Sequence, residues 1–414
     1  MNQIRVNANR IEQHITKLAE FGKTPEGGVH RVAYSDEDIR SRQYIFQLMK
    51  AAGLDVRVDE AGNIIGRREG SDASLPPILF GSHTDTVPHG GKYDGAVGIL
   101  GAIECAQVLA EKKIQTRHPL EVIVFTDEEG GLVGSRAMNG TLTAEALEEK
   151  SHSGKTVREG ILALGGNPDK LDNVVRKKGE IKAFLEIHIE QGRVLEDKDV
   201  DIGVVEGIVG ISWWDVTIEG FSNHAGTTPM DRRQDALLAA AHLIIAVNTV
   251  VTGVEGSQVG TVGRISAEPG APNVIPGKVV MSLELRDLST EKIFSLFGGI
   301  KKEAAQIAEK FGTQISFDPI DAMAIPAPTD EKIRNIIAES ARELGLSIHF
   351  MPSGAGHDAQ DMAKIAPTGM IFVPSVGGIS HSPEEFTKTQ DIVNGANVLL
   401  LTILRIDGER PAQF

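Results

Sequence analysis

The sequence has little of what marks secreted or membrane-spanning proteins. It contains one cysteine, Cys105, so no disulfide can form within the chain, which fits a reducing compartment. The most apolar long stretch, residues 237–247, is too short to cross a bilayer and includes His242. The N-terminal segment is polar and has no apolar signal core. We therefore expect a cytoplasmic protein and exclude a disulfide scaffold or a membrane protein.

Basic residues are scarce relative to acidic ones. Lys and Arg together number 42 and Asp and Glu 57, which gives a net charge of −15. Nucleic acids and anionic membranes are bound by clustered Lys and Arg, so we expect neither as a partner. The hydrophobic share of 41% and the charged share of 24% are ordinary for a folded protein, and 414 residues suggest two or three domains.

Apolar runs alternate with helical patterns over residues 1–208 and again over residues 328–414. Runs of this kind, separated by helices, predict an α/β domain with a mostly parallel sheet and helices on both faces. The predicted strands are 77–81, 120–126, 183–190 and 370–373, and the predicted helices are 37–53, 97–113, 330–344 and 390–406.

Residues 209–327 follow a different pattern. Their order is strand, helix, two strands, helix and strand, which is the ferredoxin-like arrangement. The predicted elements are strands at 211–219, 258–266, 278–286 and 313–319 and helices at 232–252 and 290–311. We therefore expect a discontinuous α/β domain, 1–208 plus 328–414, interrupted by a smaller inserted domain at 209–327.

Imidazole and carboxylate groups gather where predicted strands end. These groups are His83 with Asp85, Asp94 in a Gly-rich turn, the Glu128–Glu129 pair, His188 and His381. Open α/β sheets place their sites at the carboxyl ends of strands, so these loops should converge on one rim. Each feature alone is more often an ordinary surface or boundary residue, but the combination predicts a metal centre.

Three histidines and two carboxylates would satisfy two Zn²⁺-like ions that share a bridging carboxylate and a bridging water. Asp94 is short and can bridge two cations. Glu128 and Glu129 are adjacent and point in different directions, so one can bind metal while the other faces the reacting water. Asp85 could accept a hydrogen bond from the outer ring nitrogen of His83 and fix its tautomer.

Two residues of the inserted domain are candidates for substrate contact. His224, in the loop Phe221–Pro229, could donate a hydrogen bond to an oxyanion or could simply cap a helix. Arg286 ends a predicted strand, and its planar guanidinium suits either a bidentate contact with a substrate carboxylate or a surface position.

The motifs HTDTV with a downstream DG, EEG, EIHIEQG, NHAGTTPM, GAGHDAQ and GISHSP together resemble the zinc-dependent amidase branch of the M20 metallopeptidase family. This branch contains N-carbamoyl-L-amino-acid hydrolases, allantoate amidohydrolases and β-ureidopropionases. The resemblance runs from about residue 30 to 400. It implies a catalytic α/β domain with an inserted ferredoxin-like lid that also forms a homodimer.

The resemblance also implies individual roles. The metal ligands would be His83, Asp94, Glu129, His188 and His381, with Asp94 bridging both ions. Glu128 would be the general base, and His224 would reach the active site of the partner subunit. Substrate contacts would come from Gln191, His224, Asn273, Arg286, Ala355 and Gly356, and His357 and Asp358 would position their turn or assist catalysis.

The expected reaction is the hydrolysis of a linear amide or ureido C–N bond. It would use two divalent metal ions, which would be Zn²⁺, with Mn²⁺, Co²⁺ or Ni²⁺ as possible replacements. An N-carbamoyl-L-amino acid is the first expectation, since it would yield the amino acid, ammonia and carbon dioxide. Allantoate or another ureido acid is the alternative, followed by an M20-type dipeptidase or aminoacylase. A non-catalytic metal-dependent binding protein is a different class, against which Glu128 argues. Ser153–Thr156 resembles the tail of a P-loop, but Glu149 replaces the leading glycine.

Overall fold

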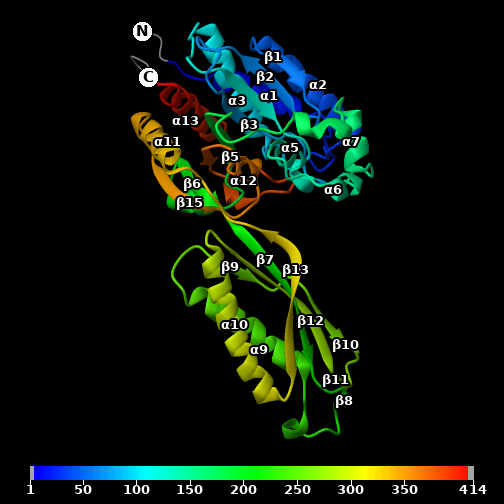
Figure 1. Cartoon of the computed structure of the whole chain (residues 1–414). Coiled ribbons are helices and arrows are strands. Elements are labelled where there is room, and N and C mark those ends of the chain that lie inside the picture. The colour runs from blue at the N-terminus through cyan, green and yellow to red at the C-terminus, as the bar shows by residue number, and fades with distance from the viewer. Residues whose placement is uncertain (1–3, 409–414) are drawn as a thin grey trace. The chain divides into compact units, whose positions relative to one another are not determined.

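The computed structural model describes residues 4–408, apart from the side chains of residues 321–323. The described chain forms two compact units. Unit 1 comprises the residues up to Gly207 together with those from Pro328 onward, and unit 2 comprises Ile208–Ala327. Figure 1 shows the elements of each unit in chain order. None of the helices in the described part of the chain is long and apolar enough to span a membrane.

Unit 1 contains a mixed sheet whose strands run in the order β1-β2-β4-β3-β5-β16-β6-β14, with β15 also paired to β6. The four strands at its centre are buried on both faces, which explains why their sequences read as unbroken apolar runs. The strands are β1 Asp55–Val58, β2 Ile64–Arg68, β3 Ile78–Ser82, β4 Leu120–Val124, β5 Ala183–Ile189, β6 Ile202–Ile208, β14 Ala327–Pro328, β15 Ile348–Ser353 and β16 Thr368–Val373.

The predicted α/β class is confirmed, but the prediction of a mostly parallel sheet is wrong outside the centre. β3 runs parallel to β4 and β5, and β16 runs parallel to β5. The pairs β1/β2, β2/β4 and β16/β6 are antiparallel. β1 and β2 form a short hairpin in which β1 is largely exposed, so they lack the apolar runs from which the sheet was predicted.

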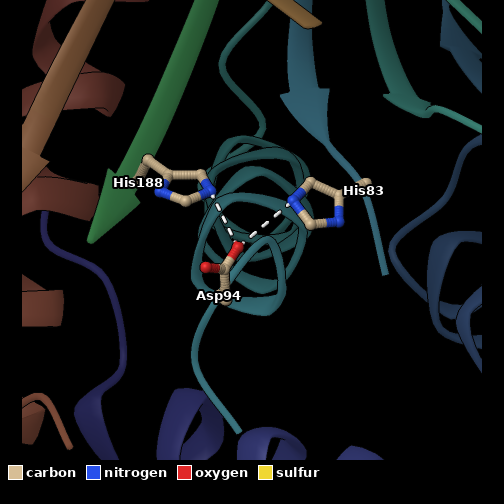
Figure 2. Close-up of side chains that lie close together, drawn as sticks. All are labelled: His83, Asp94 and His188. Carbon is tan, nitrogen blue, oxygen red and sulfur yellow. Dashed lines mark ion pairs between the residues drawn. The ribbon is translucent and has the colours of Figure 1, made fainter. Parts of the chain in front are cut away.

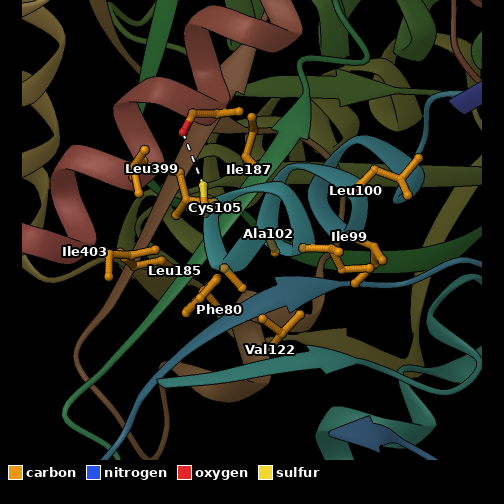
Figure 3. Close-up of a cluster of buried hydrophobic side chains, with 14 of the residues drawn as sticks. Phe80, Ile99, Leu100, Ala102, Cys105, Val122, Leu185, Ile187, Leu399 and Ile403 are labelled. Carbon is orange, nitrogen blue, oxygen red and sulfur yellow. Dashed lines mark hydrogen bonds between the residues drawn. The ribbon is translucent and has the colours of Figure 1, made fainter. Parts of the chain in front are cut away.

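Helices α3 and α13 form the apolar centre of unit 1 where they pack on β5. Figure 3 shows side chains of this cluster, among them Ile99 and Ala102 of α3, Leu185 and Ile187 of β5, and Leu399 of α13. The helices of unit 1 are α1 Ala8–Ala19, α2 Asp36–Ala51, α3 Ala96–Glu111, α4 Glu128–Gly131, α5 Val133–Met138, α6 Ala144–Glu148, α7 Val157–Ala163, α8 Val194–Lys198, α11 Glu331–Glu343, α12 Asp358–Met362 and α13 Thr389–Asp407.

Cys105 lies on α3 within this apolar centre and is buried. Its thiol contacts the backbone oxygen of Ala396 on α13 at 3.4 Å. Burial raises the pKa of the thiol well above its usual value, so the group stays neutral and acts as a small apolar side chain. Cys105 therefore has a packing role in unit 1.

Unit 2 is built on an antiparallel sheet in the order β10-β12-β7-β13, with β9 paired to β12. β7 and β12 alternate between buried and half-buried residues, and α9 and α10 cover the buried side, as Trp214 stacked on Phe297 illustrates. The elements are β7 Gly210–Glu219, β8 Asn223–His224, α9 Ala236–Thr252, β9 Val259–Thr261, β10 Ile265–Glu268, β11 Val274–Ile275, β12 Lys278–Asp287, α10 Thr290–Phe311 and β13 Gln314–Ala324.

The single strand predicted at 258–266 is two strands, β9 and β10, that pair with different parts of β12. Between the two strands, the backbone N–H of Arg264 donates to the hydroxyl of Ser282 on β12, and the backbone oxygen of Arg264 accepts the N–H of Ser282. The alternation of apolar residues did not reveal this division into two strands.

Candidate metal centre

The candidate ligands lie where neighbouring strands of the unit 1 sheet end. His83 directly follows β3, Glu128 and Glu129 come just after β4, His188 is near the end of β5, and His381 comes after β16. Because β4, β3, β5 and β16 are adjacent and parallel, their carboxyl ends meet at one edge of the sheet. Sites far apart in sequence are thereby brought together.

Asp94 lies between two of the histidines (Figure 2). Its Oδ1 is 3.4 Å from Nε2 of His83 and 3.2 Å from Nε2 of His188. The turn that presents Asp94 requires a glycine next to it. Gly95 has a φ of +61°, and a Cβ at this position would lie 2.5 Å from the His83 ring. His83, Asp94 and His188 form one group with the spacing of metal ligands.

A second group uses the other oxygen of the same carboxylate. Nε2 of His381 is 3.5 Å from Oδ2 of Asp94 and 3.6 Å from Oε2 of Glu129. Asp94, Glu129 and His381 also have the spacing of metal ligands. Because Asp94 directs one oxygen to each group, a single carboxylate connects two candidate cation sites.

The residues fit divalent cations by their chemistry. Imidazole nitrogens and carboxylate oxygens are the ligands that Zn²⁺ and similar ions take in proteins. Nε2 of His83 is buried and has no hydrogen-bond partner among the described residues, which suits a coordinating nitrogen. Burial and the charge of Asp94 raise the pKa of Glu129 to about 7, so a neighbouring cation would be needed to keep it fully ionised at neutral pH.

Backbone oxygens orient two of the rings. Nδ1 of His188 lies 2.9 Å from the carbonyl oxygen of Ile189, and Nδ1 of His83 lies 3.1 Å from that of Asp85. With Nδ1 donating to these carbonyls, each Nε2 is left unprotonated for a metal. Oδ1 of Asp85 also lies 3.6 Å from Nδ1 of His83, an ion-pair distance, so the carboxylate faces this ring at a longer distance than the backbone oxygen does.

The carboxylate of Asp85 also holds the Glu128–Glu129 turn. Its Oδ1 accepts the backbone N–H of Glu128 at 3.4 Å, and its Oδ2 accepts that of Glu129 at 3.2 Å. Asp85 is 1% exposed, so these contacts are shielded from water. The side chain thus links the loop after β3 to the loop after β4.

Glu128 and Glu129 diverge, as their adjacency predicts. Glu129 faces His381, whereas Oε2 of Glu128 lies 3.7 Å from His83 and its Oε1 lies 3.9 Å from Nδ1 of His357. Burial raises the pKa of Glu128 well above its usual range, and the charge of Glu129 adds to this effect. A carboxylate whose pKa is raised in this way can accept a proton readily.

Three further predicted residues lie around the same centre. Nε2 of Gln191 donates to Oδ2 of Asp94 at 2.6 Å and lies 3.4 Å from Nε2 of His381. Ala355 and Gly356 belong to the turn between β15 and α12, which leads into His357, whose ring centre is 4.5 Å from that of His188.

The turn is held by Ser353, whose hydroxyl accepts the N–H of Ala355 and lies 2.9 Å from Nε2 of His357. His357 and Asp358 are both buried, and within the described chain neither Nδ1 of His357 nor the Asp358 carboxylate has a hydrogen-bond partner. Burial lowers the pKa of His357 and raises that of Asp358, which favours the neutral form of both side chains.

Unit 2 brings two of its predicted residues together. His224 in β8 pairs with Val274 in β11, and the oxygen of Asn273 accepts the N–H of Ala225. His224 is exposed, and its Nδ1 accepts the N–H of Gly226 at 3.0 Å. His224 and Asn273 therefore form one exposed corner of unit 2.

Arg286 is not part of this corner. It lies at the end of β12 that pairs with β9, whereas β8 and β11 lie at the other end of unit 2 (Figure 1). Nε and Nη2 of Arg286 donate to the two carboxylate oxygens of Glu284 at 2.8 and 3.2 Å, and Nε1 of Trp213 also donates to Glu284. These contacts fix the plane of the Arg286 guanidinium.

Two buried acids near the centre were not predicted. Glu186 accepts a hydrogen bond from Ser82 at 2.6 Å and groups with His188 and His357. Its position two residues before His188 on one strand was a usable signal, because alternate residues share a face. Glu385 contacts the backbone of Asp94, but in sequence it is one of two adjacent acids and looks like a surface residue.

The sequence model of peptidase family M20/M25/M40 matches residues 79–405. The chain belongs to this family. M20 enzymes are metal-dependent, which agrees with the ligand groups around Asp94.

Relatives within the M20 family include amidohydrolases of similar length. An N-carbamoyl-L-amino acid amidohydrolase of Geobacillus stearothermophilus is 41% identical over 97% of this chain and 99% of its own. A ureidoglycolate hydrolase of Arabidopsis thaliana is 40% identical over 98% and 88%. An allantoate amidohydrolase of Bacillus subtilis is 35% identical over 94% and 96%. The expected M20 resemblance is confirmed.

Solved structures of the M20 family share the fold. The crystal structure of an amidase of the hydantoinase/carbamoylase family from Burkholderia multivorans is 35% identical and has a TM-score of 0.92, covering 99% of this chain and 100% of its own. The mixed α/β architecture of this chain is therefore that of known amidases.

Proposed function

We propose that this chain is a binuclear metal-dependent amidohydrolase that cleaves a linear ureido C–N bond, with an N-carbamoyl-L-amino acid as the first substrate. The observation that carries the proposal is the pair of ligand groups that share Asp94. His83 and His188 would complete one site, and Glu129 and His381 the other. The ions would be Zn²⁺, or Mn²⁺, Co²⁺ or Ni²⁺ in its place.

Bound divalent ions would supply a Lewis acid and lower the pKa of a water molecule. The chain itself supplies the base. Glu128 is buried beside His83, and its raised pKa suits a group that takes a proton from water and later delivers it to the leaving nitrogen. For an N-carbamoyl amino acid, this proton transfer leads to the free amino acid, ammonia and carbon dioxide.

Four of the predicted residues would contact the substrate. Arg286 would anchor a carboxylate through its guanidinium, oriented by Glu284. Gln191 and the turn at Ala355 and Gly356 lie near the metal ligands and would contact the reacting group.

His224 would stabilise the oxyanion with Asn273 beside it, and we propose that they act in the active site of a partner subunit. The separation of this corner from Arg286 within one copy of unit 2 supports the assignment. Unit 2 would then serve as the lid and as the dimer contact. A homodimer would allow one chain to supply Arg286 and the other to supply His224 and Asn273 to the same substrate.

Ureido acids other than carbamoyl amino acids are the second candidate. Relatives named for allantoate and for ureidoglycolate are 35% and 40% identical to this chain, close to the 41% of the N-carbamoyl-L-amino acid enzyme. All of these compounds carry a ureido group and a carboxylate, so the proposed base and anchor would serve each of them.

An ammonia-release assay would test the proposal. Metal-loaded protein would be supplied with carbamoyl-L-amino acids, carbamoyl-β-alanine, allantoate, ureidoglycolate and dipeptides, with chelated protein as the control. We expect turnover of a ureido acid that chelation abolishes and Zn²⁺, Mn²⁺, Co²⁺ or Ni²⁺ partly restores. Full activity in metal-stripped protein would refute the metal mechanism, and tight binding without any turnover would indicate a binding protein instead.

A further inference from the structure

Glu385 is a buried carboxylate that contacts the backbone of Asp94. It is 3% exposed, and its Oε1 accepts the backbone N–H groups of Tyr93 at 2.8 Å and of Asp94 at 3.1 Å. Its Oε2 accepts the hydroxyl of Ser380 at 2.9 Å. One carboxylate therefore connects the turn that presents Asp94 with the segment that contains His381.

The surroundings of Glu385 leave room for this contact. A Cβ on Gly91 would lie 2.1 Å from Oε1 of Glu385, so a larger residue at that position would displace the carboxylate. Next to Glu385, Phe386 packs edge-to-face on Tyr93, with ring centres 5.7 Å apart. The two segments are thus joined by an apolar contact as well as by hydrogen bonds.

Ser380 extends the connection to the ligand side chain. Its hydroxyl lies 3.1 Å from Oδ2 of Asp94, the oxygen that faces His381. A serine hydroxyl has one hydrogen, so it donates either to Asp94 or to Glu385 at a given moment. Glu385 and Ser380 together hold both the backbone of Asp94 and the oxygen directed at the second ligand group.

A carboxylate in this place is costly for folding. Glu385 lies out of water and close to a second acid, Asp94. An apolar residue would avoid this cost but could not accept the N–H groups of Tyr93 and Asp94. The contacts of Glu385 point to a role in the geometry of Asp94 and His381.

We propose that Glu385 is a positioning residue that sets the spacing between Asp94 and His381, and that it thereby controls divalent-cation affinity at the Asp94–Glu129–His381 group. The inference rests on the two-ion site of the proposed function. The His83–Asp94–His188 group should depend less on Glu385, because backbone carbonyls of Asp85 and Ile189 orient its two histidines.

Metal binding can be measured directly with Co²⁺. Metal-stripped full-length protein would be titrated by equilibrium dialysis, with the visible absorption of bound Co²⁺ as a second readout. We expect Glu385→Ala to weaken the binding of one ion about ten- to hundredfold, the usual effect of losing a group that orients a ligand, and to leave the other ion unchanged. Unchanged binding of both ions, or equal weakening of both, would overturn the proposal.

Two conservative variants separate geometry from charge. In Glu385→Gln the amide oxygen can still accept both backbone N–H groups, and the NH₂ group can donate to Ser380, so we expect both ions to bind nearly as in the unmodified protein. Glu385→Asp keeps the charge but shortens the side chain, so one ion should bind more weakly. If circular dichroism shows that Glu385→Ala does not fold, Glu385→Asp replaces it in the Co²⁺ titration. Unchanged binding of both ions, or equal weakening of both, would again overturn the proposal.

Glu384→Ala is the matched control, because it removes the same charge from the neighbouring, exposed position and should leave both affinities unchanged. A loss equal to that of Glu385→Ala would show a general charge effect and overturn the proposal. If the unmodified protein binds only one Co²⁺, the two-ion site itself fails. If the unmodified protein binds two Co²⁺ ions and the Glu385 variants bind both with the same affinities, only the positioning role of Glu385 is refuted.

Discussion

Removing the Glu129 carboxylate should stabilise the metal-free protein at neutral and alkaline pH. Burial raises the pKa of Glu129 from its ordinary 4.5 to about 7. The folded state therefore holds a proton that the unfolded state releases between these two values. Since each pH unit of this interval contributes about 1.4 kcal/mol, ionisation of Glu129 lowers the free energy of unfolding by about 3 kcal/mol at pH 8.

The difference in stability between Glu129→Gln and the unmodified protein should depend on pH. Well below pH 4.5, Glu129 is largely protonated in both states, so Glu129→Gln should change the stability of the metal-free protein little. As the pH rises to 7 and above, the variant should become more stable than the unmodified protein by about 3 kcal/mol. Saturating Zn²⁺ should reverse the order, because the variant lacks one ligand and gains less from binding.

Hydrogen exchange of peptides from β3 and β5, corrected for the intrinsic effect of pH, would measure the opening of unit 1. Both tryptophans, Trp213 and Trp214, lie in unit 2, so their fluorescence serves as an internal reference that the variant should leave unchanged. A stability difference that stays constant between pH 5 and pH 8 would refute the reasoning, as would a variant that is less stable than the unmodified protein at pH 8 without metal.

Three more predictions concern activity. Glu128→Gln should bind metal normally but lose at least about a hundredfold in kcat, the usual contribution of a general base; a nearly normal kcat would exclude Glu128 from that role. Arg286→Ala should raise KM mainly for substrates with a carboxylate, measured against uncharged ureas or amides, and an equal effect on both would argue against an anchor. If His224 acts in a partner subunit, mixing His224→Ala with Glu128→Gln protein should restore part of the activity once subunits exchange. Failure to recover after verified exchange would count against a shared site.

Local sequence patterns were enough to predict the central strands and the main helices. The strands β3, β4, β5 and β16 are buried on both faces, and their apolar runs are visible in the sequence. The flanking hairpin β1/β2 was missed because its strands are short and β1 is mostly exposed. Strand direction at the edges of the sheet depends on pairing, which the local pattern does not contain.

The residue types of the candidate centre were also readable from the sequence, since His83, Glu129, His188 and His381 follow or end strands. The contacts among them were not readable. The Asp85 carboxylate accepts hydrogen bonds from the Glu128–Glu129 turn and lies at a longer distance from the His83 ring, and Arg286 lies apart from His224. Such contacts depend on side-chain direction after the strands have assembled.

The sequence by itself determined which strands form the centre of unit 1 and which ligand types follow them, because burial and periodicity are properties of neighbouring residues. Only the tertiary structure decided that Asp94 directs one oxygen to each ligand group and that Glu385, almost three hundred residues further along, holds its backbone. These contacts join residues far apart in the chain, and the order of strands in the sheet brings them within hydrogen-bonding distance.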